Sequence, residues 1–207
     1  MCMVIKKITK KQDGFALLIS LIVVGVVISV GLTILDLSIT QVRLSDNAKQ
    51  SELAFHAANA GVECGLYWRR TSSEDMLGGN AISPECFGST DSSVTPINVP
   101  SGDDPGEIED GEVNLYQYEF SWGTEPRCTK ITTAVITANL SAGGATLHNV
   151  NQVVGDGGVN AIPGFPAGDS ECEVGEQCTI MAVRGYNQNC NNITNFGTTE
   201  REVLLQF

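Results

Sequence analysis

Histidine and basic side chains are scarce in this sequence, and their scarcity excludes several classes of function. Only His56 and His148 occur among 207 residues, which disfavours a histidine-based metal site or catalytic triad. The formal net charge is −12, and so acidic a chain is a poor partner for nucleic-acid phosphates. No G-x-S-x-G, P-loop or G-x-G-x-x-G motif stands in a strand–turn–helix context, so we expect no enzymatic activity.

The charge is unevenly distributed along the chain. Eight basic and five acidic residues give residues 1–70 a net charge of +3, whereas four basic and nineteen acidic residues give residues 71–207 a net charge of −15. The apolar fraction of 42% is too high for a disordered chain. The sequence therefore predicts a stem that begins with basic residues, followed by an acidic body with its own core.

A membrane-spanning helix is predicted over residues 15–35, FALLISLIVVGVVISVGLTIL, which contain no charge. As a helix they rise about 30 Å, the thickness of a bilayer core. A buried core helix is the alternative, but soluble helices rarely run this long without a polar face. A cleaved secretory signal would have a shorter apolar region and a small-residue site after it, and no A-x-A pattern follows Leu35.

The residues on either side of this run set its orientation and its continuation. Four lysines lie within MCMVIKKITKKQDG, and the positive-inside rule places that end in the cytoplasm and the body outside. Residues 36–68 contain no proline, and Phe55, Ala58, Val62 and Leu66 form an apolar stripe at helical spacing. We therefore expect one helix over residues 15–68, about 80 Å long, whose second half packs on a partner surface.

The first seventy residues resemble the class III prepilin signal of type IV pilins and type II secretion pseudopilins. The resemblance rests on a basic leader ending in Gly14, then Phe15, an apolar run and a long amphipathic helix. In that family a prepilin peptidase cuts after the glycine and methylates the new amino terminus. The resemblance thus implies a leader over residues 1–14, cleavage after Gly14 and a mature chain starting at Phe15.

Within that family, GFALLISLIVV and SELAFHAANAGVE look most like the N-terminal region of PilX-like minor pilins. Major pilins carry a glutamate at the fifth residue after the cleavage point, and Ile19 stands there in this chain. PilX-like and certain tip-complex members also lack that glutamate, so the departure fits a minor subunit. Asn59 is a second departure, since the PilX-like segment usually has glutamate at that position.

The body over residues 71–207 is predicted to be rich in strands. Residues 74–111 are rich in Gly, Pro and Ser and indicate loops, whereas β-branched or alternating runs indicate strands at 112–122, 127–140, 145–154, 178–187 and 199–207. We expect an α+β fold in which the stem helix, over residues 15–70, packs on an antiparallel sheet. That arrangement is also the pilin architecture.

Cysteine counting supports cleavage and disulfides together. Seven cysteines leave a spare thiol, but Cys2 lies in the leader. The remaining six, outside the cytoplasm, fit three disulfides, and their spacings match no zinc ribbon. Six cysteines allow fifteen pairings, which the sequence does not decide; the set we favour is Cys64–Cys86, Cys128–Cys190 and Cys172–Cys178.

Calcium is the one cofactor that the composition suggests as a candidate. Several acids crowd the segment SGDDPGEIEDGE, among them Asp103, Asp104, Glu107, Glu109 and Asp110. Carboxylates in a Gly- and Pro-containing loop are ligands for hard cations, but the spacing is not that of an EF-hand. A solvated acidic loop is the reading we favour, so the sequence predicts no required cofactor.

The resemblance implies a minor pilin that helps prime, tip or attach a type IV pilus. Its partners would be other pilins, through the N-terminal helix, together with the prepilin peptidase and the inner-membrane assembly machinery. It would cross the cytoplasmic membrane once, with its head outside, before reaching a surface pilus. A type II secretion minor pseudopilin and a signal-anchored surface binding protein are the alternatives.

Overall fold

The computed structural model describes residues 13–90, 93–123, 127–141 and 143–207. Most of the leader predicted over residues 1–14, including Cys2 and the four lysines, therefore lies outside the described residues. The chain forms two compact units, Met1–Ala48 and Lys49–Phe207. Among the described residues, the first unit contributes only helix, and the second contains the rest of that helix and every strand.

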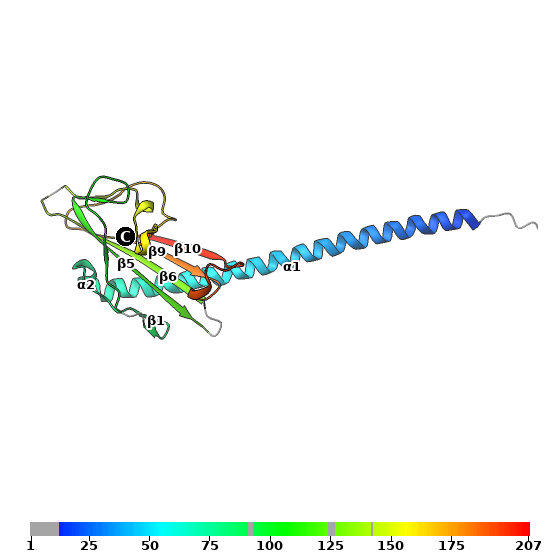
Figure 1. Cartoon of the computed structure of the whole chain (residues 1–207), viewed down its shortest axis with the longest axis horizontal. Helices are drawn as coiled ribbons and strands as arrows, with labels where there is room; N and C mark the ends of the chain where they lie inside the picture. Colours follow the sequence, from blue (N-terminus) through cyan, green and yellow to red (C-terminus); the bar gives the residue numbers. More distant parts are fainter. Residues whose placement is uncertain (1–12, 91–92, 124–126, 142) are drawn as a thin grey trace, which may run out of the picture. The chain divides into compact units, whose positions relative to one another are not determined.

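Helix α1 runs from Asp13 to Thr71 without a break (Figure 1). The absence of proline allows this length, because a proline inside the helix would remove a backbone N–H donor and clash with the preceding turn. The single helix predicted over residues 15–68 is confirmed. In the first unit, the large apolar side chains between Phe15 and Leu44 are exposed.

In the second unit α1 packs on a sheet through its smallest residues. Ala54, Ala57 and Ala58 are fully buried, and a Cβ on Gly61 would overlap side chains of Thr129 and Val183. The stripe predicted to include Phe55 was wrong at that residue, because Phe55 remains 48% exposed. Close approach of helix and sheet selects small side chains, and counting apolar residues at helical spacing does not distinguish them from large ones.

The central sheet is antiparallel, with the strand order β10-β9-β6-β5-β3. Its strands are β3 (Ile97–Asn98), β5 (Gly111–Trp122), β6 (Arg127–Ala138), β9 (Gln177–Tyr186) and β10 (Glu200–Gln206). The predicted strands at 112–122, 127–140, 178–187 and 199–207 are thus confirmed to within a few residues. The α+β fold, with one long N-terminal helix packed on an antiparallel sheet, is also confirmed.

Short elements complete the second unit. They are helix α2 (Ser73–Leu77), the hairpin β1 (Glu85–Cys86) and β2 (Ser89–Thr90), a small sheet of β4 (Ile108–Glu109), β7 (Ala145–Leu147) and β8 (Ser170–Cys172), and 3-10 turns at Val150–Gln152, Asp156–Gly158 and Cys190–Asn192. The strand expected over 145–154 was too long, because β7 ends at Leu147. After it the chain turns at Asn149, whose backbone is left-handed with φ 43°.

The two faces of the central sheet bury different cores. Alternation along β5 directs Tyr116, Tyr118 and Phe120 into one core, where they pack with residues of α1, including Val62 and Leu66. The opposite face directs Val113 and Leu115 into a second core, covered by Leu147, Val150 and Ile162 from the connecting segments. That second core covers only part of the outer face of the sheet, and the remainder carries polar side chains.

Candidate functional site

The first candidate surface is the apolar helix of the first unit. An 18-residue window of α1 has a mean hydropathy of 2.9, and none of it is buried within the chain. The helix is thus long and apolar enough to cross a membrane. Large side chains along it are about half to two-thirds exposed, from Phe15 at 71% to Leu35 at 59%. Water is a poor environment for such a surface, so lipid or other helices must cover it.

The hydroxyl groups within this apolar helix are already satisfied. Every hydroxyl between residues 15 and 40 donates to a backbone carbonyl three or four residues earlier; these are the hydroxyls of Ser20, Ser29, Thr33, Ser38 and Thr40, at 2.8–2.9 Å. Such bonds leave no hydroxyl that requires water. A Cβ on Gly25 or on Gly31 would meet nothing within 4 Å, so both positions leave room for a neighbouring helix.

The residues of the expected processing site lie at the start of this helix. Gly14 belongs to the first turn of α1, and Phe15 follows with its ring 71% exposed. Ile19, at the position where major pilins carry glutamate, is 45% exposed on the same helix. The helix therefore presents neither a charge nor a buried contact at the residues that follow the expected cleavage point.

Three disulfides lie in the second unit. They join Cys64 to Cys86, Cys128 to Cys190 and Cys172 to Cys178, with Cα–Cα distances of 6.1, 4.6 and 5.8 Å. These are the pairs favoured from the sequence, and each distance lies in the range that a disulfide requires. The first attaches hairpin β1–β2 to α1, the second attaches the turn after β9 to β6, and the third closes a short loop before β9.

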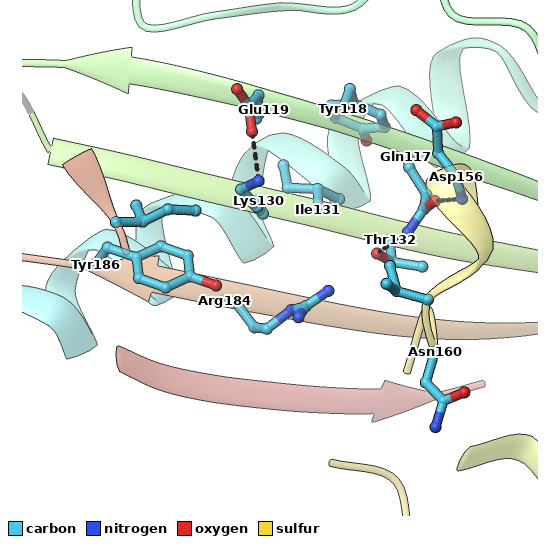
Figure 2. A pocket seen from close by; sticks show the side chains of 12 residues that line it. Gln117, Tyr118, Glu119, Lys130, Ile131, Thr132, Asp156, Asn160, Arg184 and Tyr186 are labelled. Carbon is cyan, nitrogen blue, oxygen red and sulfur yellow. Dashed lines mark hydrogen bonds and ion pairs between the residues drawn. The ribbon is translucent and has the colours of Figure 1, made fainter. Parts of the chain in front are cut away.

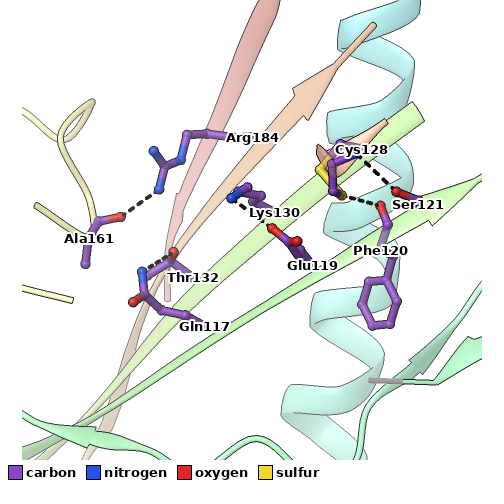
Figure 3. Close-up of polar contacts among 10 residues, drawn as sticks. Gln117, Glu119, Phe120, Ser121, Cys128, Lys130, Thr132, Ala161 and Arg184 are labelled. Atoms are coloured by element: carbon purple, nitrogen blue, oxygen red, sulfur yellow. Dashed lines mark hydrogen bonds and ion pairs between the residues drawn. A yellow bond between two sulfur atoms is a disulfide. The ribbon is translucent and has the colours of Figure 1, made fainter. Parts of the chain in front are cut away.

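The second candidate site is a pocket of about 460 Å³ on the outer face of the central sheet. Figure 2 shows charged and amide side chains from β5, β6 and β9 gathered there, beside the segment that carries Asp156 and Asn160. Lys130 Nζ lies 2.8 Å from Glu119 Oε2, and Arg184 Nη2 donates to the carbonyl oxygen of Ala161 at 3.3 Å (Figure 3).

Amide contacts make one wall of this pocket rigid. Gln117 accepts a hydrogen bond from the backbone N–H of Asp156 at 2.7 Å and donates to the hydroxyl of Thr132 at 3.3 Å. Burial raises the pKa of Tyr186, and the negative charge of Glu200 raises it further, so the phenol stays protonated at neutral pH. Gln117 thus links β5 to β6 and to the segment that carries Asp156.

The acidic loop raised as a calcium candidate does not gather its carboxylates. Among the described residues, the only group of three or more potential ligands close enough to share an ion is Glu119 with Cys128 and Cys190, and those two sulfurs form a disulfide. The five loop acids are therefore spread out, with Glu107 half-buried and the other four exposed. Glu109 instead contacts a histidine.

That histidine, His148, is held between two carboxylates. Its Nδ1 lies 3.2 Å from Asp169 Oδ2 and its Nε2 lies 3.3 Å from Glu109 Oε2, while the backbone N–H of Asn149 donates to Asp169. Burial lowers the pKa of His148, but hydrogen bonds and charges from Asp169 and Glu109 outweigh this effect and raise the pKa above 6.5. The arrangement joins β4, the turn after β7 and the segment before β8.

Sequence reasoning missed both the pocket and the histidine contact. The residues of each are far apart in the chain and are brought together by the register of the strands. A register requires knowledge of which strands pair, and the alternation of polar and apolar residues identifies only the face on which a side chain lies. The one available clue was the rarity of basic residues after residue 70.

No family model matches this chain, and neither a curated protein nor a solved structure matches it.

Proposed function

We propose that this protein is a minor pilin, a low-copy subunit of a type IV pilus. The observation that carries the proposal is the apolar surface of α1 from Phe15 to Leu44, which has no partner among the described residues of its own unit. A helix of this kind is stable in a bilayer, and it remains covered outside the bilayer only if similar helices surround it. Storage in a membrane followed by assembly into a helical filament core satisfies both conditions.

The orientation in the membrane follows from the chemistry at the two ends. Lysines are concentrated before the apolar run, and the cytoplasmic side retains such residues. The three disulfides of the second unit fit an oxidising compartment outside the cytoplasm. We therefore place the amino terminus inside and the head outside, with cleavage after Gly14 by a prepilin peptidase and methylation of Phe15.

Ile19 favours a minor subunit over a bulk filament subunit. A carboxylate within the membrane is costly unless it is paired, and in major pilins a neighbouring amino terminus is thought to provide the partner. The apolar side chain of Ile19 removes both the charge and the need for that partner. A subunit with this residue enters a filament through apolar packing alone, in the role of a priming or tip subunit.

Fractionation of cells that carry an epitope-tagged chain tests the proposal. We expect the tagged chain in the sheared pilus fraction at a small fraction of the major pilin, and a strong loss of surface pili when its gene is deleted. Its presence only with secretion pseudopilins would indicate the type II secretion alternative. Retention of the whole population in the membrane of fully piliated cells would indicate a signal-anchored surface protein and contradict the proposal.

A further inference from the structure

A row of four charged side chains crosses the outer face of the central sheet. Glu119 of β5 is opposite Lys130 of β6, Lys130 is opposite Arg184 of β9, and Arg184 is opposite Glu202 of β10. Residues directly opposite in antiparallel strands point to the same face, about 5 Å apart at Cβ. The two cations therefore lie side by side at the centre, with one acid at each end.

Two like charges in opposite positions repel each other, so their placement requires compensation. Lys130 has a close carboxylate, since its Nζ lies 2.8 Å from Glu119. The charge of Arg184 is compensated less closely. Its buried Nε has no hydrogen-bond acceptor among the described residues and lies 3.9 Å from Glu202 Oε1. A guanidinium has five N–H groups. Among the described residues, the guanidinium of Arg184 donates one hydrogen bond, from Nη2 to the carbonyl oxygen of Ala161.

The placement is notable because basic residues are so rare in this part of the chain. Residues 71–207 contain four basic residues against nineteen acids, and two of the four, Lys130 and Arg184, line this pocket. The strongly acidic surroundings repel polyanions, which excludes nucleic acids and polyphosphates as occupants. A ligand with one isolated negative charge gains from the two cations without meeting that repulsion over its whole length.

The rest of the pocket suits a hydroxylated body. Its neutral polar groups include the hydroxyls of Tyr186 and Thr132 and the amide of Asn160, while its acids are Glu119, which is paired with Lys130, and Asp156. In Figure 2 the carboxylate of Asp156 points away from Arg184. A volume of about 460 Å³ holds one or two sugar units.

We propose that this pocket binds an acidic sugar, with its carboxylate between Lys130 and Arg184 and its hydroxyls on the neutral groups. Because the Nε of Arg184 is buried, its two Nη atoms bind the carboxylate in a forked geometry, and Lys130 adds a point charge. The sugar is either a free monosaccharide acid or the single acidic unit of an otherwise neutral glycan. This inference goes beyond the filament role and does not depend on it.

Ligand-observed NMR titration of the full chain in detergent tests the site. The probes are sodium glucuronate, its neutral amide glucuronamide, acetate, and a tetrasaccharide in which one glucuronate is the only charged unit. We expect saturable glucuronate binding with a Kd of about 1 mM or tighter, and binding of glucuronamide weaker by at least about tenfold. Equal affinity for monomer and tetrasaccharide would identify a free or terminal sugar, whereas much tighter tetrasaccharide binding would identify a glycan chain.

Three matched variants separate the pocket from charge in general. Lys130→Gln and Arg184→Lys should each weaken glucuronate binding by about tenfold or more. Lys130→Gln removes a positive charge, and Arg184→Lys keeps the charge but removes the two parallel N–H donors of the guanidinium. Arg201→Gln removes the same charge from a residue that contacts Ser51 outside the pocket, and it should change affinity less than about twofold. Thermal unfolding of each variant shows whether the fold persists, and Lys130→Gln decides the matter if Arg184→Lys does not fold.

Four results would overturn the inference. They are the absence of saturable binding by folded protein at about 50 mM glucuronate, equal binding of glucuronamide, acetate binding as tight as glucuronate, and an equal loss of affinity in Arg201→Gln. The second would show that the carboxylate is not recognised, and the third would show an adventitious anion only. None of them bears on the minor pilin proposal, which concerns a different surface.

Discussion

Gly185 in β9 lies directly beneath the backbone of Ala54 in α1, and a Cβ on this glycine would overlap the carbonyl oxygen of Ala54. The next turn of the helix is as close, because the same Cβ would meet the backbone nitrogen of Ala58. Beside it, the hydroxyl of Thr129 donates to the carbonyl oxygen of Ala57 at 2.9 Å. Helix and sheet therefore meet backbone to backbone at this point.

Gly185→Ala should destabilise the head by about 1–3 kcal/mol, since a methyl group has no room between two backbones. The measurement is chemical unfolding of the full chain in detergent, monitored through a spectroscopic signal of the sheet. Gly143→Ala is the matched control, because its Cβ would meet nothing within 4 Å and its φ is not left-handed. Unfolding of both variants at the same denaturant concentration would contradict the close approach of α1 to β9.

The disulfides should differ in their effect on stability. Cys128–Cys190 spans 62 residues and Cys172–Cys178 spans 6. If a disulfide acts only by restricting the unfolded chain, removing the first should lower the free energy of unfolding by about 4 kcal/mol and removing the second by about 2 kcal/mol. Paired Cys→Ala variants, compared by urea unfolding, check that order. A larger loss on removing the short loop would show that packing around Cys172, rather than chain entropy, determines the effect.

Stability should depend on pH through His148 and Asp169. The pKa of His148 is raised above 6.5, so its stabilisation is complete below about pH 6.5 and is lost as pH rises through the folded-state pKa. A backbone hydrogen bond from Asn149 lowers the pKa of Asp169 below 3.8, and the hydrogen bond and charge of His148 lower it further. The contribution of Asp169 to the free energy of unfolding is therefore present above about pH 3.8 and is lost as pH falls below that value.

His148→Gln should remove the alkaline part of this dependence. We expect its melting temperature to lie below that of the unmodified protein near about pH 5.5, and the gap to narrow by about pH 8. His56→Gln serves as the control, since His56 is exposed on α1 beside Glu52 alone. A gap that stays constant across that range would show that the two carboxylates do not retain the proton on His148.

A charge in the middle of the apolar run should weaken membrane insertion. Val26→Asp places a carboxylate near the centre of residues 15–35, where it costs about 2.5–3.5 kcal/mol on insertion scales. The expected result is release of much of the chain on alkaline extraction of membranes. Val26→Leu should remain in the membrane, and equal retention of both variants would mean that this run does not span the bilayer.

Much of the fold could be predicted because it depends on local patterns. The uncharged run after Gly14 and the absence of proline up to Trp68 predict the helix, and β-branched runs predict the four long strands. The two-residue strands, such as Glu85–Cys86, have too few residues to show a period. The position of Phe55 was missed because its exposure depends on which helix face approaches Gly185.

The candidate sites were only partly predictable. Gly14 and Phe15 are adjacent in sequence, so a motif identifies them, and that processing site remains a prediction. The pocket depends on the pairing of Lys130 with Arg184, which are 54 positions apart and meet only through the register of β6 and β9. The contact of His148 with Glu109 and Asp169 likewise joins three segments that no local pattern connects.

The central claim is that this chain is a processed pilin subunit, and its amino terminus tests that claim most directly. We propose intact-mass measurement and N-terminal sequencing of the chain recovered from membranes of cells with an active prepilin peptidase. The account predicts a mature chain that begins at N-methylated Phe15 and retains six cysteines, all in disulfides. A chain that still begins at Met1 under those conditions would contradict it.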